Sequence, residues 1–380
     1  MKKVCFDDWI VIEIPEEINT CHNKLLHLKA KTSLNLGKKL GKISSERFVG
    51  LVYGSYWEIV GSEIVPWELP SISSIDSEQQ DLGDNKSFFD DNSAQLLDSN
   101  QLSQLKEQLS SEELVQKLVQ NSTTFDKKTK FSQEKYKKRK SLKYAKVFKI
   151  IQSTSTALLC NFFSKATEKI MGIRQDSLSM ILSLANAQAG MKALVLDETH
   201  GLISLALLER IKSSQPFWMT FVKSIFPDIL YNSTGSRELH EHFSIVPIES
   251  LANGQNSISP EALENQNGAA KYNREKKAID LFQSGDHDAL VIAVKDFNAF
   301  ECLNLLVTGL APSGAVVIYS PFRESLLECY EKMMHDSRFV NVHIYESFLR
   351  EYQVLPGRTH PHMKTSGGGG YILSAIKVID

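Results

Sequence analysis

The feature that most constrains this chain is a short apolar run followed at once by an acid and a turn. Ala193 to Leu196 has the length and character of a buried strand, and Leu202 to Ile211 has the apolar spacing of a helix. Strand, turn and helix in this order make the ligand-binding unit of a Rossmann-like sheet. The sequence therefore predicts a doubly wound α/β domain organised around residues 191–203.

The turn between that strand and that helix keeps few of the glycines a cofactor needs. A unit that holds S-adenosylmethionine places an acid and then spaced glycines here, because glycine lets the backbone approach the ligand beside the helix N-terminus. Counting from Asp197, the three glycine positions of a methyltransferase turn fall on Thr199, Gly201 and Ile203. We expect the side chains at the two substituted positions to crowd the cofactor.

Three further positions at the carboxyl ends of the expected strands lack the groups that methyl transfer needs. Lys223 follows the next strand, where an acid would bind the ribose hydroxyls. Ala293 and Lys295 stand where an RNA adenine methyltransferase needs a polar or acidic group. Asp296 lies beyond that point, and an ordinary loop acid or a helix cap is the expected role. The residues predict neither a catalytic group nor a cofactor site.

Residues 151–380 alternate between helices and strands. Apolar stripes at helical spacing run from Leu159 to Ile170 and from Leu178 to Ala185. Later strands are expected at 217–222, 243–247, 289–294, 315–319, 340–345 and 371–378, with helices at 299–308 and 323–335. A long loop, not a helix, joins the last two strands, so we expect an antiparallel pair that closes the sheet.

The first 150 residues divide into a β-rich region and a polar one. β-branched and aromatic residues at 9–14 and 48–53 indicate strands of a small barrel or sheet. Residues 71–92 have the composition of a linker or surface loop, and leucines between 102 and 118 indicate two short amphipathic helices. The predicted division is a β-rich domain at 1–70, an acidic linker with short helices and a basic segment at 71–150, and a Rossmann-like domain at 151–380.

A formal net charge of −2 conceals strong charge segregation. Residues 71–113 carry ten acids against two lysines, whereas residues 127–149 carry eleven Lys or Arg residues against one glutamate. The local field of the basic segment suits a polyanion. A second basic cluster between Lys24 and Arg47 is open to two interpretations, a nucleic-acid surface or strand edges protected from aggregation by lysine.

The basic segment supports two interpretations. As an RNA contact, its cations would neutralise phosphates while Phe131 or Tyr136 stacks on a base. Alternatively, Tyr144, Val147, Phe148 and Ile151 stand at helical spacing as core positions, and the run 137–140 is a nuclear-import patch.

Other classes of site find little support. The five cysteines are far apart and form no Cys-x-x-Cys pair, so neither a disulfide frame nor a zinc knuckle is expected. No apolar run is long enough to span a membrane. Residues 367–370 are read as a structural turn, because a strand follows where a phosphate loop needs a helix. His360 and His362 lack a third ligand nearby, so no metal site is predicted.

Several separated motifs closely resemble the non-catalytic subunit of the eukaryotic tRNA N1-methyladenosine methyltransferase. They are Phe131-Ser132-Gln133-Glu134-Lys135-Tyr136 with its lysine tail, the stretch from Gly172 to Ser179, and the stretch from Leu355 to Pro361 continuing through Ser366 to Tyr371. Residues 90–95 and 197–202 are similar to the same family. The resemblance runs from about residue 85 to the C-terminus.

The resemblance implies a degenerate class I methyltransferase domain that neither binds a cofactor nor catalyses. S-adenosylmethionine is then expected in a catalytic sibling, with which this chain would form a dimer of heterodimers in the nucleus and position tRNA for modification of the T-loop adenosine. The residues expected to bind tRNA are Lys135, Lys137, Lys138, Arg139, Lys140, Arg358 and Lys364. The alternatives are an active S-adenosylmethionine-dependent enzyme with a divergent loop, and a scaffold whose basic run serves only nuclear import.

Overall fold

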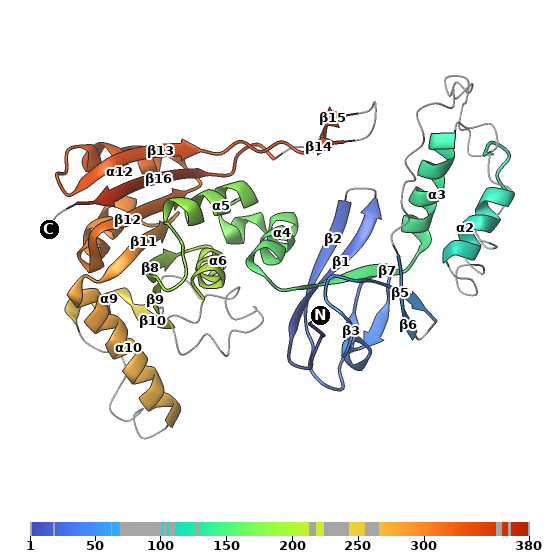
Figure 1. Cartoon of the computed structure of the whole chain (residues 1–380), viewed down its shortest axis with the longest axis horizontal. Helices are drawn as coiled ribbons and strands as arrows, with labels where there is room; N and C mark the ends of the chain where they lie inside the picture. The colour runs from blue at the N-terminus through green and yellow to red at the C-terminus, as the bar shows by residue number, and fades with distance from the viewer. Residues whose placement is uncertain are drawn as a thin grey trace. The chain divides into compact units, whose positions relative to one another are not determined.

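A computed structural model describes most of the chain and divides it into two compact units, Met1–Gln152 and Ser153–Asp380 (Figure 1). The described residues are 2–17, 20–61, 63–68, 101, 105, 111–125, 130–212, 218–223, 243–254, 266–354, 359–363 and 366–378. The expected linker at 71–92 and most of the first expected amphipathic helix lie outside these ranges.

The first unit is built on a five-stranded sheet in the order β2-β1-β7-β5-β6. Its strands are β1 (Trp9–Glu17), β2 (Thr20–His27), β5 (Tyr56–Val60), β6 (Glu63–Pro66) and β7 (Val147–Gln152). A separate small pair, β3 (Ser33–Asn35) with β4 (Lys42–Ser44), completes the strands described in this unit. The sheet therefore takes its middle strand from residues far beyond the β-rich first 70.

Both faces of this sheet are covered. Ile10 and Ile12 point to one face, where they pack with Phe48 and Phe148 in the unit's main core. Val11 points the other way, because side chains alternate along a strand, and it is also fully buried. Helix α3 (Lys130–Tyr144) contacts β1 and packs against α2 (Ser111–Gln120), so this helical pair lies over the second face.

Two predictions for this unit are wrong. Residues 48–53 form no strand: Phe48 ends a short 3-10 helix, and Gly50 and Gly54 turn the chain with φ of 88° and 87°. Val147 and Phe148 are buried, which confirms them as core positions, but together with Ile151 they lie in the strand β7 and not in a helix. Pairing with β1 and β5 on either side favours the extended form of this β-branched and aromatic run.

The second unit contains a seven-stranded sheet in the order β10-β9-β8-β11-β12-β16-β13. Its strands are β8 (Lys192–Asp197), β9 (Trp218–Lys223), β10 (Phe243–Pro247), β11 (His287–Ala293), β12 (Leu310–Ser320), β13 (Phe339–Glu346) and β16 (Tyr371–Lys377). Of these strands, only β16 runs antiparallel to its two neighbours, which confirms the predicted closure of the sheet. The strand order reverses between β8 and β11, so their carboxyl ends mark the position of a ligand site in such a sheet.

Helices cover both faces of this sheet. On one face lie α4 (Ser155–Lys165), α5 (Gln175–Leu184) and α6 (Leu202–Ile211), and on the other lie α10 (Gln266–Ser284), α11 (Ala299–Leu306) and α12 (Arg323–Met334), with the short α9 (Ile248–Asn253) beside β10. Leu194, Ile292 and Ile318 from three neighbouring strands belong to the core beneath the second set. The doubly wound α/β fold predicted from the sequence is confirmed. Within the described ranges, no helix has the length and apolar character needed to cross a membrane.

Candidate functional site

The turn after β8 is occupied by its own polar side chains. Asp197 is fully buried, and its Oδ1 accepts hydrogen bonds from the backbone N and the Oγ1 of Thr199, at 2.7 and 2.5 Å. Its Oδ2 accepts two more from the N and Oγ of Ser204, at 2.9 and 2.8 Å. The acid at this position therefore holds the first turn of α6 to the end of β8.

Glu198 links the carboxyl ends of β8 and β11 through hydrogen bonds. Its backbone N donates to the carbonyl oxygen of Ala293 at 3.0 Å, and its Oε2 accepts from the backbone N of Lys295 at 2.7 Å and of Asp296 at 3.2 Å. The side chain of Glu198 is only 4% exposed. A carboxylate thus bridges the switch point, where a cofactor would otherwise lie in an active sheet of this kind.

The substituted glycine positions are filled. Thr199 and Ile203 have no exposed surface, and Thr199 Oγ1 also accepts from the backbone N of Ile203 at 3.3 Å. Gly201 remains glycine because it precedes α6 with a φ of 89°, a left-handed conformation that side chains rarely adopt. The strand-turn-helix geometry is kept while its interior is packed.

The remaining positions at this edge carry no group suited to methyl transfer. Ala293 pairs with Asp197 across β11 and β8 and is fully buried. Lys223 ends β9. Asp296 lies in the loop before α11, which agrees with the expected loop acid, and the helix cap is Asn298, which accepts from the backbone N of Phe300 and of Glu301.

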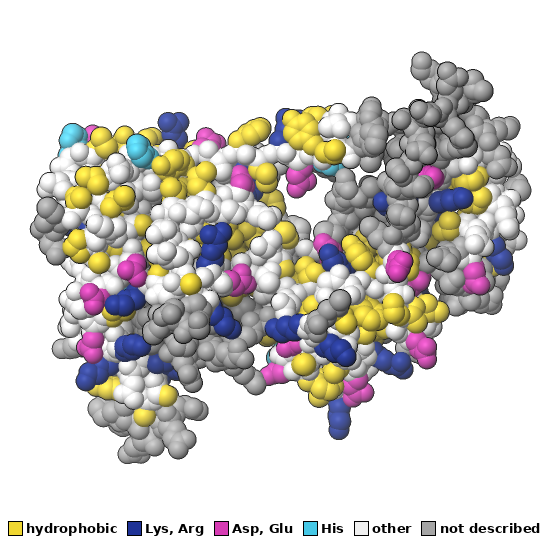
Figure 2. Space-filling model, in the orientation of Figure 1, with side chains coloured by type: hydrophobic (Ala, Val, Ile, Leu, Met, Phe, Trp, Pro, Cys, Tyr) yellow, Lys and Arg dark blue, Asp and Glu magenta, His cyan; other side chains and the backbone are white. Residues whose placement is uncertain are grey.

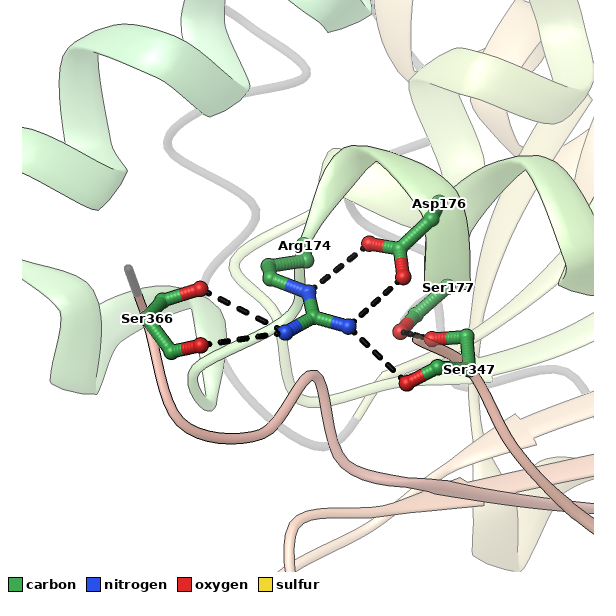
Figure 3. A network of polar contacts seen from close by, with 5 residues as sticks. All are labelled: Arg174, Asp176, Ser177, Ser347 and Ser366. Atoms are coloured by element: carbon green, nitrogen blue, oxygen red, sulfur yellow. Dashed lines mark hydrogen bonds and ion pairs between the residues drawn. The ribbon is translucent and has the colours of Figure 1, made fainter. Parts of the chain in front are cut away.

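A second polar network joins two of the motifs singled out in the sequence. Arg174, before α5, donates through Nε and Nη2 to both carboxylate oxygens of Asp176, at 2.8 and 2.7 Å (Figure 3). Nη2 also donates to the carbonyl oxygen of Ser347 at 2.9 Å, and Nη1 lies 3.4 Å from both the carbonyl oxygen and the Oγ of Ser366. Sequence reasoning assigned no role to Arg174, although its motif was recognised.

The charge state of this network follows from its contacts. Burial opposes ionisation of Asp176, yet hydrogen bonds from Arg174 and Ser347 hold the pKa of its carboxyl below the ordinary value. The hydrogen bond to Asp176 correspondingly raises the pKa of Arg174. The pair is therefore ionised at neutral pH, and bidentate Arg–carboxylate pairs are among the stronger and geometrically most specific hydrogen-bonded contacts.

An arm of about twenty residues, Ser347–Ser366, connects β13 to the glycine turn before β16. Its short hairpin pairs β14 (Tyr352–Gln353) with β15 (His360–Pro361). Large apolar side chains are exposed along it, among them Phe348 at 85%, Tyr352 at 54%, Val354 at 75% and Met363 at 95%. Hydrophobic side chains gather over this hairpin (Figure 2). No periodicity in the sequence predicted this apolar surface.

Helix α3 places the cations of the basic segment on different sides, some exposed and some half-buried. Ser141 and Ala145 are buried, whereas Arg139 and Lys143, each two residues from Ser141 and so about 200° around the helix, are exposed. Lys146, just beyond the helix, is exposed as well. We name Arg139, Lys143 and Lys146 the outer cations; the last two belong to the basic segment but were not among the selected residues.

Of the other selected cations, Lys137 is also exposed, and its Nζ lies 5.6 Å from the centre of the Phe125 ring. Lys140 is half-buried, with its Nζ 5.2 Å from the centre of the Tyr136 ring. Lys138 is half-buried on the side of Ser141. The side chain of Lys135, and the whole of Arg358 and Lys364, lie outside the described residues.

His360 and His362 lie on the arm. Among the residues that the structure describes, no group of three or more His, Cys, Asp or Glu side chains is placed to hold a metal ion.

Comparison with known proteins agrees with this geometry. The Gcd10p family model matches residues 3–348. The chain is 29% identical to the tRNA (adenine(58)-N(1))-methyltransferase non-catalytic subunit TRM6 of Mus musculus, covering 87% of this chain and 81% of the relative. It is 28% identical to the protein of the same name from Debaryomyces hansenii, with 93% and 83% covered.

Two solved structures share the fold. A SAM-dependent O-methyltransferase from Thermotoga maritima has a TM-score of 0.55 at 12% identity, covering 100% of this chain and 96% of that one. The tRNA (m1A58) methyltransferase TrmI from Aquifex aeolicus has a TM-score of 0.50 at 11% identity, covering both chains completely. The second unit is thus a Rossmann-like methyltransferase fold preceded by a β-sheet domain.

Proposed function

The chain belongs to the Gcd10p family, and from that membership we propose that it is the non-catalytic subunit of a tRNA (adenine(58)-N(1))-methyltransferase. The matches to the relatives that carry this name span most of each relative and most of this chain. The observation that carries the proposal is the self-filled carboxyl edge, where Asp197 and Glu198 are buried and hydrogen-bonded within the chain. The chain supplies a methyltransferase fold without methyltransferase chemistry.

The same edge does not fit S-adenosylmethionine. Both carboxylate oxygens of Asp197 already accept two hydrogen bonds each, and Glu198 joins the ends of β8 and β11. Thr199 and Ile203 are packed where the cofactor would need bare backbone. The methyl donor is therefore bound by the catalytic sibling, and this chain holds no cofactor.

The contribution of this chain is to hold tRNA. Modifying a T-loop base requires its extraction from the stack, at a cost of a few kcal/mol. Cations that neutralise phosphates on the tRNA body release counterions and can offset that cost. The exposed outer cations fit this role, as does the exposed Lys137, whereas Lys140 is half-buried beside the rings of Tyr136 and Tyr144.

The partner is the catalytic subunit, and the arm is its docking surface. An apolar surface as exposed as that of Phe348, Val354 and Met363 is typical of an interaction site. Two such heterodimers pair to form the active complex. The run from Lys137 to Lys140 also serves as an import signal, which places the complex in the nucleus.

Replacing Arg139, Lys143 and Lys146 together by glutamine tests the RNA contact in the reconstituted complex. We expect weaker tRNA binding and a slope of log affinity against log salt that is shallower by about two to three, since each lost phosphate contact contributes about 0.7–0.9. A matched control removes three exposed lysines from α10: Lys271, Lys276 and Lys277. Equal salt slopes for the two triple variants would rule out α3 as the contact.

A further inference from the structure

Arg174 is the point at which three separate segments of the second unit meet. It is 4% exposed, and its guanidinium group makes five hydrogen bonds, two to Asp176, one to Ser347 and two to Ser366 (Figure 3). A guanidinium carries five N–H donors in a fixed plane. The residue thus serves as a junction and has little donor capacity left for a ligand.

Two of these three segments are the ends of the arm. Ser347 begins it and Ser366 ends it, so a single side chain anchored through Asp176 to the start of α5 holds both ends together. A further bond of 2.8 Å, between the Oγ atoms of Ser177 and Ser347, strengthens the first end. Among the described residues between these ends, Phe348, Val354 and Met363 are exposed and contribute little packing that would hold the arm.

The glycine turn makes room for this junction. A Cβ atom on Gly369 would lie 2.4 Å from Ser177 Oγ and 3.0 Å from Arg174 Nε. A Cβ atom on Gly370 would lie within 2.6 Å of three atoms of the buried Tyr319 side chain, whose hydroxyl donates to the carbonyl oxygen of Met171. The second half of the turn is therefore fitted to the network that holds the arm.

We propose that Arg174 is a positioning residue that sets the arm for docking to the catalytic subunit. This inference rests on the proposed function, because it takes the arm as the docking surface. An arm held at both ends before the partner arrives loses less conformational freedom on binding than a loose one, so affinity rises without a new contact. Arg174 acts through the arm, because it is only 4% exposed and its donors are engaged within the chain.

The test replaces Arg174 by glutamine in the full chain and measures two quantities. The first is hydrogen exchange of the arm, where the backbone N of His362 donates to the carbonyl oxygen of Glu351 at 2.9 Å. The second is affinity for the catalytic subunit. We expect faster exchange confined to residues 347–366 and assembly weaker by about tenfold or more.

Arg338→Gln is the matched control. Arg338 forms the same kind of bidentate pair with Asp336, two residues away, but its side chain otherwise donates to Asn304 and not to the described part of the arm. We expect this variant to keep arm protection and affinity. If Arg174→Gln fails to fold, Arg174→Lys replaces it, since a lysine retains a charge beside Asp176 but lacks the planar fork that holds both arm ends. Unchanged exchange and affinity in a folded Arg174 variant would overturn the proposal.

A variant in which a short Gly-Ser linker replaces residues 348–365 separates the role of Arg174 from that of the arm. Loss of assembly in this variant, together with normal assembly of Arg174→Gln, would contradict the role of Arg174 while leaving the arm as the docking surface. Normal assembly without the arm would contradict the docking surface itself. We expect loss in the deletion and partial loss in the Arg174 variant.

Discussion

Asp197 and Glu198 show how single side chains determine what this edge of the sheet can do. The spacing of the turn identified Thr199 and Ile203 as the substituted glycine positions, and both side chains are buried. The sequence did not predict the hydrogen-bond partners of the two carboxylates. Asp197 accepts from the backbone N of Ser204, and Glu198 accepts from the backbone N of Lys295, almost a hundred residues away. Such partners depend on how β8 and β11 pair, which no local pattern encodes.

A buried histidine gives a prediction at the same scale. His287 is fully buried, with its ring nitrogens 2.9 Å from the carbonyl oxygen of Gly309 and from Thr220 Oγ1. Burial lowers its pKa to about 4. Above pH of about 6.5 the ring is neutral in both folded and unfolded chains, so its contribution to stability is complete.

As pH falls from about 6.5 to about 4, only the unfolded chain takes up the proton. The free energy of unfolding is then expected to fall by up to about 3 kcal/mol from this residue. Urea unfolding across this range, compared between the native chain and His287→Gln, isolates the contribution. Parallel curves for the two proteins would show that His287 titrates normally.

Helices and strands were predicted with uneven success, and the reason is physical. Helix α6 at 202–211 and strand β10 at 243–247 have the predicted bounds, because the local pattern of apolar residues is enough to define them. Residues 147–152 read as helical because apolar positions three and four apart also occur in a strand that is buried on both faces. Their extended form depends on pairing with β1, more than a hundred residues earlier.

The glycine turn at 367–370 allows a test at the level of one element. We expect Gly370→Ala to lower the free energy of unfolding by about 2 kcal/mol or more, because its φ is 79° and the added methyl group would meet the buried Tyr319. Gly368→Ala is the control, since no atom lies within 4 Å of the position that its added methyl group would take, and a change within about 0.5 kcal/mol is expected. Equal thermal stability of the two variants would contradict this explanation of the turn.

For the whole molecule, a methyltransferase fold has kept its architecture while its ligand edge has become part of the core. The net charge of −2 gave no sign of this specialisation. The local charge distribution did, with cations concentrated in residues 127–149, whereas the apolar surface of the arm is visible only in the structure. The sequence predicted the basic segment as a whole, but selecting its outward members required knowing which side of α3 lies on the sheet.

Methyl transfer in a reconstituted system tests the central claim most directly. With S-adenosylmethionine and unmodified tRNA, N1-methyladenosine is measured for this chain alone, for the catalytic subunit alone and for the two together. We expect no product from this chain alone, and a rate for the pair that exceeds that of the catalytic subunit by a factor of about ten or more, equivalent to about 1.4 kcal/mol in the barrier. Product formed by this chain alone, or an equal rate with and without it, would contradict the claim.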